Sequence, residues 1–312
     1  DEFVILSEMK EAGNVITVAR KILVEMAKPF ALSDREVFIS ASIGISLYPK
    51  DGSSGETLMR NADTAMYSAK KHGRNTFRFY ADSMNVSTVE RLNMESKLRR
   101  AVDNGELLLH YQPQVNLHNG EIIGVEALIR WDHPELGMIH PDKFISLAEE
   151  TGLISPISEW VLHTACAQMK EWQAGALPEL KVAVNVSAHQ FRRQNLLKLT
   201  AGALLKTGLD GRFLELEMTE SAVMEDVERV AKILQDLKGV TNVEISIDDF
   251  GTGYSSLSYL KQFAIDKLKV DQSFVRDITR DPNDAASTLA IITMAHSLGM
   301  TVIAEGVETP GQ

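Results

Sequence analysis

From residue 107 onward, short apolar runs alternate with stretches whose apolar residues recur at helical spacing. Asn119-Gly120 separates the first two runs, and this dipeptide is the strongest short signal of an antiparallel hairpin. The predicted strands are Leu107–Val115, Ile122–Trp131, Val182–Val186, Phe213–Met218, Val243–Ile247, Lys267–Val270 and Thr301–Ala304. The predicted helices between them are Phe144–Glu150, Ile157–Ala174, Gln190–Lys206, Val227–Lys238 and Ala285–Leu298.

This alternation predicts an α/β unit of the parallel-barrel class, in which strands are followed by helices that cover the outside. Such a barrel closes with eight strands, and the sequence shows seven. We therefore expect the last strand and helix to lie beyond Gln312. We expect both ends of the sequence to be truncated, because the chain begins within one apolar run and ends shortly after another.

The first 80 residues carry a different pattern, typical of a mixed α+β unit. The expected pieces are strand Phe3–Leu6, helix Ala12–Met26, strands within Val37–Leu47, helix Ser54–His72 and strand Thr76–Tyr80. Residues 83–104 place apolar side chains at helical spacing among many charges, which favours a connecting helix over a flexible linker. We expect three parts, residues 1–81, 82–106 and 107–312.

Composition narrows the class of protein. A hydrophobic content of 44% over 312 residues suffices for two packed cores, and no apolar run is long enough to span a bilayer. The single cysteine, Cys166, lies in a helical pattern and predicts a buried thiol in a reducing cytoplasm. The net charge of -11 disfavours binding to a nucleic acid polymer, so a phosphate ligand would need local cations.

Polar side chains end nearly every predicted strand of the second unit. Because the carboxyl ends of parallel barrel strands meet on one face, we expect these side chains to converge there. They are Glu126, Asn185, Glu217, Asp248, Asp249, Lys269, Asp271 and Glu305. Oxygen ligands of this kind suit Mg²⁺ or Mn²⁺, whereas the eight histidines form no zinc-like cluster. Adjacent Asp248 and Asp249 can serve a pair of metal ions, an arrangement that hydrolyses phosphodiesters.

Each residue taken alone has a simpler explanation. A carboxylate after a strand often caps the next helix, and Asp271 could do so. Asn185 could satisfy a turn, and Lys269 could extend to solvent. Only the joint pattern favours a metal site.

Seven motifs follow one another over about two hundred residues. They are Tyr111-Gln112-Pro113, Glu126-Ala127-Leu128 with Arg130, Asn185-Val186-Ser187, Glu217-Met218-Thr219-Glu220-Ser221, Asp248-Asp249-Phe250-Gly251-Thr252-Gly253-Tyr254-Ser255-Ser256, Lys269-Val270-Asp271 and Ala304-Glu305-Gly306-Val307-Glu308. This ordered set resembles the EAL family of bacterial cyclic di-GMP phosphodiesterases. The resemblance implies a modified TIM barrel with an antiparallel first strand, homodimerisation through this domain, and hydrolysis of cyclic di-GMP to linear pGpG with two Mg²⁺ or Mn²⁺ ions.

The same resemblance implies a role for each matching residue. The implied metal ligands are Glu126, Asn185, Glu217, Asp248 and Asp249, with Asp248 shared by both ions. Glu305 would orient or deprotonate the attacking water, and Lys269 would hold water or stabilise charge near the phosphate. The remaining implied roles are substrate contacts for Gln112 and Arg130, and support of the glycine-containing loop 249–256 for Glu220 and Asp271. A surface salt bridge is the alternative for Arg130.

The first 80 residues contain a second ordered set of motifs. They are Asp1-Glu2-Phe3, Ala41-Ser42-Ile43-Gly44-Ile45-Ser46, Ala62-Asp63, Ala65-Met66-Tyr67, Ala69-Lys70 and Gly73-Arg74-Asn75. This set resembles the latter part of a GGDEF domain, the diguanylate cyclase fold. It implies that Lys70 and Arg74 meet the phosphates of a nucleotide such as GTP. A solvated basic helix end is the alternative for both.

Three functions remain open at this point. The leading hypothesis is a cyclic di-GMP phosphodiesterase with a GGDEF domain as regulator or cyclase. The second is a receptor that binds cyclic di-GMP without cleaving it, although the glutamate and the paired aspartates whose loss would mark such a receptor are all present. An unrelated metal-dependent barrel enzyme is the third, because fold alone does not fix function.

Overall fold

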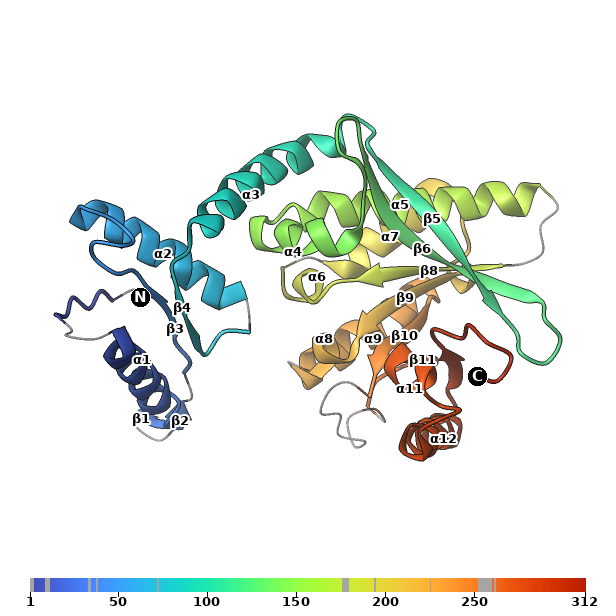
Figure 1. Cartoon of the computed structure of the whole chain (residues 1–312). Coiled ribbons are helices and arrows are strands. Elements are labelled where there is room, and N and C mark those ends of the chain that lie inside the picture. The colour runs from blue at the N-terminus through green and yellow to red at the C-terminus, as the bar shows by residue number, and fades with distance from the viewer. Residues whose placement is uncertain are drawn as a thin grey trace. The chain divides into compact units, whose positions relative to one another are not determined.

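The computed structural model describes residues 3–8, 12–32, 35–37, 39–71, 73–175, 180–193, 195–224, 226–251, 260 and 262–312. The chain divides into two compact units, Asp1–Ser96 and Lys97–Gln312. The division falls within helix α3 (Asp82–Ala101), in the region where the sequence predicts a connecting helix. Each unit is described below by itself (Figure 1).

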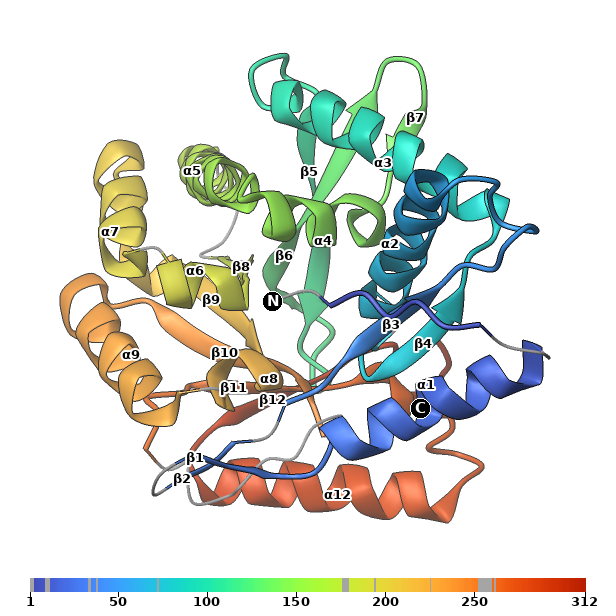
Figure 2. The same ribbon diagram turned by 90° about the vertical axis from the view of Figure 1, so that its left-hand side faces the viewer.

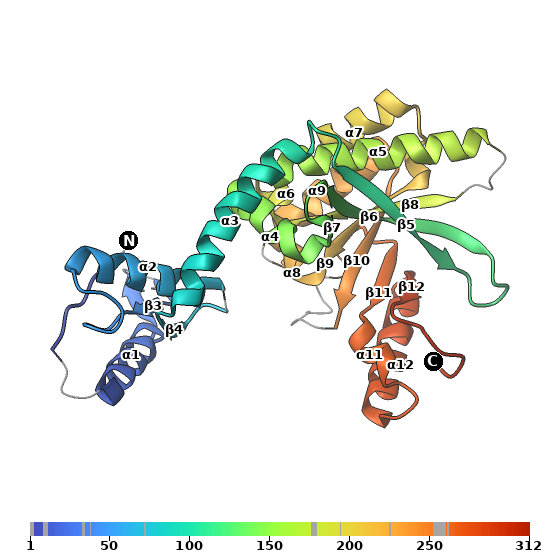
Figure 3. The ribbon, with the colours of Figure 1, turned by 45° about the horizontal axis from the view of Figure 1, so that its top comes forward.

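The described part of the first unit contains two short pairs of strands, two helices and the first part of α3. Strands β1 (Phe30–Leu32) and β2 (Arg35–Val37) pair antiparallel, and β3 (Ser42–Ile45) pairs in parallel with β4 (Thr76–Phe79). Helices α1 (Ala12–Met26) and α2 (Gly55–Lys71) lie on opposite sides of the β3–β4 pair (Figures 1 and 3). Helix α2 packs tightly on β3, because a Cβ at Gly44 would lie 1.9 Å from the Ala62 carbonyl oxygen.

The prediction of a strand at Phe3–Leu6 is wrong. Residues 3–8 have no regular secondary structure, and the side chains of Phe3 and Leu6 are 89% and 97% exposed. A strand requires a partner for its backbone hydrogen bonds, and no described strand pairs with this segment. The region Val37–Leu47 also differs, since its regular structure comprises the end of β2 and the four residues of β3.

A curled sheet forms the frame of the second unit. Its strands are β5 (Leu107–Val115), β6 (Ile122–His133), β7 (Gly137–Ile139), β8 (Lys181–Val186), β9 (Leu214–Thr219), β10 (Glu244–Phe250), β11 (Lys267–Val270) and β12 (Thr301–Ala304). Their order is β12-β11-β10-β9-β8-β6-β5, and the short β7 pairs with β6. β5 and β6 are antiparallel, and every pair from β6 to β12 along this order is parallel. All seven predicted strands are present, and the antiparallel hairpin is confirmed.

Helices surround this sheet, and the long helices lie along its outer side (Figure 2). They are α4 (Pro141–Thr151), α5 (Ile154–Ala174), α6 (Ala188–Arg193), α7 (Leu196–Thr207), α8 (Glu220–Met224), α9 (Val227–Thr241), α11 (Gln272–Arg276) and α12 (Pro282–Ser297), with a 3-10 turn at Gly211–Phe213. The predicted helix Gln190–Lys206 is divided between α6 and α7. The side chain of Asn195 accepts a hydrogen bond from the Lys198 amide and so caps the start of α7.

The core of the second unit lies between the sheet and these helices. Trp131 and Phe144 are fully buried, and their rings meet edge to face with centroids 5.6 Å apart. Such an aromatic contact contributes about 0.5–1.5 kcal/mol beyond the burial of apolar area. Cys166 of α5 is fully buried as predicted, and burial raises the pKa of its thiol to about 12. Among the described helices, none is long and apolar enough to cross a membrane.

Candidate active site at the strand ends

Strand register brings the predicted site residues to one end of the sheet. Asn185 of β8 lies beside Glu217 of β9, and Asp248 of β10 lies beside the residue two positions after Glu217. Glu126 lies in β6 and Glu305 directly follows β12. Because side chains alternate between the two faces of a strand, residues two positions apart share a face. The parallel arrangement therefore collects these polar side chains, although they are far apart in the sequence.

Lys269 of β11 is the centre of this cluster. Its ammonium Nζ lies 3.2 Å from Glu126 Oε2, 3.0 Å from Glu217 Oε2 and 3.1 Å from Asp248 Oδ2. It also lies 2.8 Å from Glu305 Oε1. The Lys269 side chain is 2% exposed, so the prediction that it could extend to solvent is excluded. One ammonium facing four carboxylates leaves the cluster strongly negative when all are ionised.

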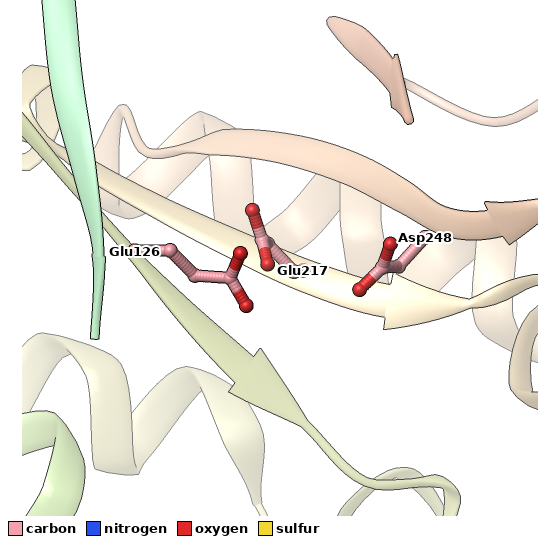
Figure 4. Close-up of side chains that lie close together, drawn as sticks. All are labelled: Glu126, Glu217 and Asp248. Atoms are coloured by element: carbon pink, nitrogen blue, oxygen red, sulfur yellow. The ribbon is translucent and has the colours of Figure 1, made fainter. Parts of the chain in front are cut away.

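Two groups of carboxylates can each surround a metal ion. Oxygens of Glu126, Glu217 and Asp248 lie within 4.8 Å of one another, and so do oxygens of Asp248, Asp249 and Glu305. Figure 4 shows the first group, with side chains from β6, β9 and β10 turned toward a common space. Asp248 belongs to both groups, as the resemblance implies. Such all-oxygen sets match the ligands that Mg²⁺ and Mn²⁺ take in proteins.

An unpaired buried oxygen supports the same assignment. Glu217 is fully buried, and its Oε1 has no hydrogen-bond partner among the described residues. A buried carboxylate oxygen without a partner is costly, and a cation in this place would satisfy it. Asn185 is linked to the same set, because its Nδ2 donates a hydrogen bond of 2.8 Å to Glu126 Oε1. The donor set therefore fits a hard divalent ion.

Burial and mutual repulsion alter the acidity of the cluster. Burial raises the pKa of Glu217 well above its ordinary value, and Glu126 and Asp248 add to this while Lys269 opposes it. Burial likewise raises the pKa of Glu305 and of Asp249, with Asp248 adding to both. For Lys269, burial opposes the charged form, but the four surrounding carboxylates outweigh burial and raise its pKa.

Asp249 and Gly251 continue the chain in an unusual backbone conformation. Both have positive φ, 55° and 102°, and β10 runs through Phe250 beyond the predicted end at Ile247. The Glu220 carboxylate, which is 2% exposed, accepts a hydrogen bond of 2.9 Å from the Gly251 amide. Glu220 therefore holds the backbone just after the paired aspartates. The rest of the predicted glycine-containing loop, residues 252–256, lies outside the described residues.

Gln112 and Arg130, the predicted substrate contacts, lie near Glu126 on the hairpin. Gln112 is exposed and pairs in register with Glu126, whereas Arg130 is half-buried and lies four residues further along β6. The Arg130 guanidinium donates a hydrogen bond of 2.8 Å to the Ile129 carbonyl oxygen. Within the described part of the chain Arg130 forms no ion pair, which counts against the salt-bridge alternative.

Asp271, Lys70 and Arg74 are not part of this cluster. The Asp271 carboxylate accepts a hydrogen bond of 3.0 Å from the Ser273 amide and caps α11, so the simpler explanation of this residue is confirmed. Lys70 lies in the last turn of α2 in the first unit. Arg74 follows that helix with a positive φ of 53°.

Sequence reasoning missed two charged residues directly next to the cluster. Lys267 and Glu215 precede Lys269 and Glu217 by two positions and form a buried ion pair. The available signal was the strand alternation, which places residues two apart on the same face.

Comparison with known proteins identifies the family. Residues 95–312 match the EAL domain family, and residues 1–76 match the diguanylate cyclase GGDEF domain family. The chain belongs to the EAL family. The EAL match covers the cluster around Lys269 and all of its carboxylates, and the fold is the modified TIM-barrel class expected for the family.

Several relatives of this EAL-family chain carry names that state an activity. It is 47% identical over 312 residues to the bifunctional diguanylate cyclase/cyclic di-GMP phosphodiesterase MucR of Pseudomonas aeruginosa, and 41% identical to the cyclic di-GMP phosphodiesterase NbdA of the same organism. The whole chain is matched, but it spans 45% and 40% of the length of these two relatives.

The fold also resembles a solved structure with a bound ligand. The structure of the PaMucR phosphodiesterase in complex with c-di-GMP is 46% identical, with a TM-score of 0.68, and the match covers 70% of this chain and 88% of that one.

Proposed function

We propose that this chain hydrolyses cyclic di-GMP to linear pGpG with the help of two Mg²⁺ or Mn²⁺ ions. The observation that carries the proposal is that two sets of three acidic residues, each able to hold a metal ion, share Asp248, which contacts the Lys269 ammonium. Two adjoining sites for divalent ions are an arrangement that catalyses phosphodiester hydrolysis. The names of the relatives and the ligand of the PaMucR structure support cyclic di-GMP as the substrate.

The residues at the strand ends divide into holders of metal and holders of substrate. Glu126, Asn185, Glu217 and Asp248 would hold the first ion, and Asp248 with Asp249 would hold the second. The ions, when bound, neutralise the carboxylates and stabilise the charge that develops on the reacting phosphate. Arg130 binds a phosphate of the substrate through its planar guanidinium, which can donate two parallel hydrogen bonds. Gln112 binds the substrate from the neighbouring strand.

Hydrolysis requires a proton acceptor for the attacking water, and we assign this role to Glu305. Burial raises the pKa of Glu305, so its carboxylate is a stronger base than an exposed one. As the water oxygen bonds to phosphorus, the bond from phosphorus to the 3′-oxygen breaks, and the water proton passes to Glu305. The leaving oxygen takes up a proton to complete the linear product. Lys269, 2.8 Å from Glu305, keeps this carboxylate oriented and stabilises negative charge near the phosphate.

Turnover of cyclic di-GMP tests the proposal directly. We expect the chain with Mn²⁺ to convert cyclic di-GMP to pGpG, measured by chromatography, and a chelator to abolish the reaction. Glu305→Gln should lower kcat by about 100- to 10,000-fold, because a positioned general base contributes that factor. Glu126→Ala should remove both turnover and binding of the first ion. Binding of cyclic di-GMP without metal-dependent turnover would contradict the proposal and favour a receptor.

We also propose roles for the parts outside the cluster. Residues 1–81 form the GGDEF part, residues 82–106 the connecting helix, and residues 107–312 the phosphodiesterase domain. The GGDEF part binds the phosphates of GTP through Lys70 and Arg74 and regulates the barrel. The protein acts in the cytoplasm, either free or as the cytoplasmic part of a larger sensor, and forms a homodimer through the EAL domain. A monomeric mass by light scattering at working concentrations would contradict the dimer.

A further inference from the structure

Two lysine–glutamate pairs lie one behind the other on the inner face of the sheet. The first is Lys269 with Glu217, at the centre of the cluster. The second is Lys267 with Glu215, in direct hydrogen-bonded contact. Each member of the second pair precedes its counterpart by two residues, on β11 and on β9 respectively. The two pairs are therefore about 6.6 Å apart along the strands.

The second pair is unusually buried for charged groups. Glu215 is fully buried, Lys267 is 8% exposed, and Glu215 Oε1 has no hydrogen-bond partner among the described residues. Burying two charges costs free energy that their attraction does not always recover, and apolar residues of similar size often stabilise a fold as well or better. Stability alone therefore does not explain why this position holds an ion pair.

Strand register gives Lys267 a second possible partner. Ser246 of β10 pairs with Lys267 on one side and with Glu217 on the other, so the three residues form one row across the sheet. Two strand spacings separate the Lys267 and Glu217 backbones, about 9.6 Å, which the long, flexible lysine side chain can largely cover. Glu217 presents its unpaired buried Oε1 on this inner face. Lys267 pairs with Glu215 instead.

We propose that Glu215 is a positioning residue that holds the Lys267 ammonium away from the metal-binding carboxylates. With Glu215 in place, Lys269 is the one lysine among the described residues that competes with divalent ions for Glu217. Without it, the Lys267 ammonium turns to Glu217 Oε1, fills a metal-ligand position and repels the ions. This inference rests on the metal-dependent function proposed above.

The proposal predicts effects that follow the sign of charge. Glu215→Gln removes one negative charge of the pair and should raise the Mn²⁺ dissociation constant about tenfold, because a freed ammonium acts on a divalent ion at short range. Lys267→Met removes the ammonium, leaves the negative charge of Glu215 in place and should bind Mn²⁺ more tightly than the unaltered chain. The double variant should return to the wild-type value. Ser246→Ala, an uncharged change in the same row, is the matched control and should leave the constant unchanged.

Calorimetric titration of the whole chain with Mn²⁺, without nucleotide, measures these constants independently of activity. Circular dichroism establishes that each variant is folded. Weaker binding in both single variants would indicate a packing role and overturn the proposal, as would unchanged binding in Glu215→Gln.

Two further outcomes are decisive. Should Glu215→Gln not fold, the proposal requires Lys267→Met to bind Mn²⁺ more tightly than the double variant, and equal binding would overturn it. Failure of the unaltered chain to bind Mn²⁺ would overturn the metal-dependent function and this inference with it. If the unaltered chain binds Mn²⁺ but the dissociation constants of the variants do not follow the sign of the charge change, the inference about Glu215 fails and the metal-dependent function stands.

Discussion

A single ammonium stands at the point where four carboxylates meet. At the scale of the residue, Lys269 stabilises the fold before any metal is bound, because it offsets the repulsion among Glu126, Glu217, Asp248 and Glu305. The attraction does not neutralise the group, so the remaining negative charge is available to divalent ions. The same lysine thus stabilises the metal-free protein and leaves the site able to bind cations.

Replacing Lys269 by methionine should destabilise the metal-free protein by about 3–5 kcal/mol, the usual effect of removing one partner of a buried ion pair. Saturating Mn²⁺ should restore part of this loss, since the ion supplies positive charge to the same carboxylates. Thermal unfolding with and without Mn²⁺ measures both effects. Lys97→Met is the control, because it breaks an exposed pair with Glu135 and should cost at most about 1 kcal/mol. Equal losses in the two variants would contradict this role of Lys269.

Metal-free stability should also depend on pH through Glu217. Burial raises the pKa of this carboxyl in the folded protein above the ordinary value of 4.5 that it has in the unfolded chain. At a pH between the unfolded-state pKa and the folded-state pKa, the folded state therefore holds more protons than the unfolded chain. The free energy of unfolding should therefore fall as pH rises through this interval. Urea unfolding without metal in a series of buffers above pH 4.5 measures the slope. Glu217→Gln should reduce the slope of the unfolding free energy against pH. An unchanged slope in this variant would show that another group causes the pH dependence.

At the scale of the element, the ends of the strands set the geometry of the site. Glu305 follows β12 directly, and its amide donates a hydrogen bond of 3.1 Å to the Val270 carbonyl oxygen of β11. The next residue, Gly306, has a φ of 69°, and a Cβ there would lie 2.8 Å from the Cβ of Gln272. The glycine allows the chain to turn closely past α11 while Glu305 keeps its place beside Lys269.

Gly306→Ala should therefore lower phosphodiesterase activity beyond its effect on stability. Gly299→Ala is a matched control, because Gly299 has a similar φ of 77° but open space around its missing side chain. Both changes should cost about 1–2 kcal/mol from the left-handed backbone. Only Gly306→Ala should also reduce kcat, since the contact with Gln272 displaces Glu305. Steady-state kinetics and thermal unfolding measure the two effects, and equal kcat in both variants would contradict the argument.

The strands and the acidic cluster were predictable because they depend on local patterns. Apolar runs predicted seven of the eight strands of the large sheet and missed the short β7. The polar side chains noted along those strands include each carboxylate now found near Lys269, although Glu126 lies within β6 and not at its end. The contacts of Lys269 and the burial of Lys267 were not predictable, because they depend on register between strands far apart in the sequence. Phe3–Leu6 was predicted as a strand from its apolar run, but it has no regular secondary structure. An apolar run forms a strand only where a partner strand is present.

At the scale of the whole molecule, the proposed regulation by GTP concerns both units. Lys70 lies in the last turn of α2, which ends at Lys71, and Gly73, Arg74 and Asn75 beyond it all have positive φ. A basic helix end followed by such a turn suits phosphate groups. The carboxylate cluster, by contrast, belongs wholly to the second unit. Regulation of the barrel by GTP therefore requires a signal that passes from one unit to the other.

GTP should change the phosphodiesterase rate or the half-saturating concentration of cyclic di-GMP. Replacing both Lys70 and Arg74 by alanine should abolish this effect and leave the rate without GTP unchanged, because these residues lie outside the barrel. Lys21→Ala, which removes an exposed lysine of α1, serves as the control for loss of charge. Kinetics with and without GTP measure the response. A response that persists in the double variant, or is absent in the unaltered chain, would contradict this regulation.

The buried thiol of Cys166 provides a natural reporter of motion within the barrel. It belongs to α5, has no exposed surface, and has a pKa of about 12, so near neutral pH it is both shielded and protonated. A thiol reagent can therefore label it only during moments when α5 separates from the sheet. Because the chain has no other cysteine, the labelling rate reports this opening without any engineered probe. Ligands that tighten the barrel should slow the labelling in proportion to the stability they add.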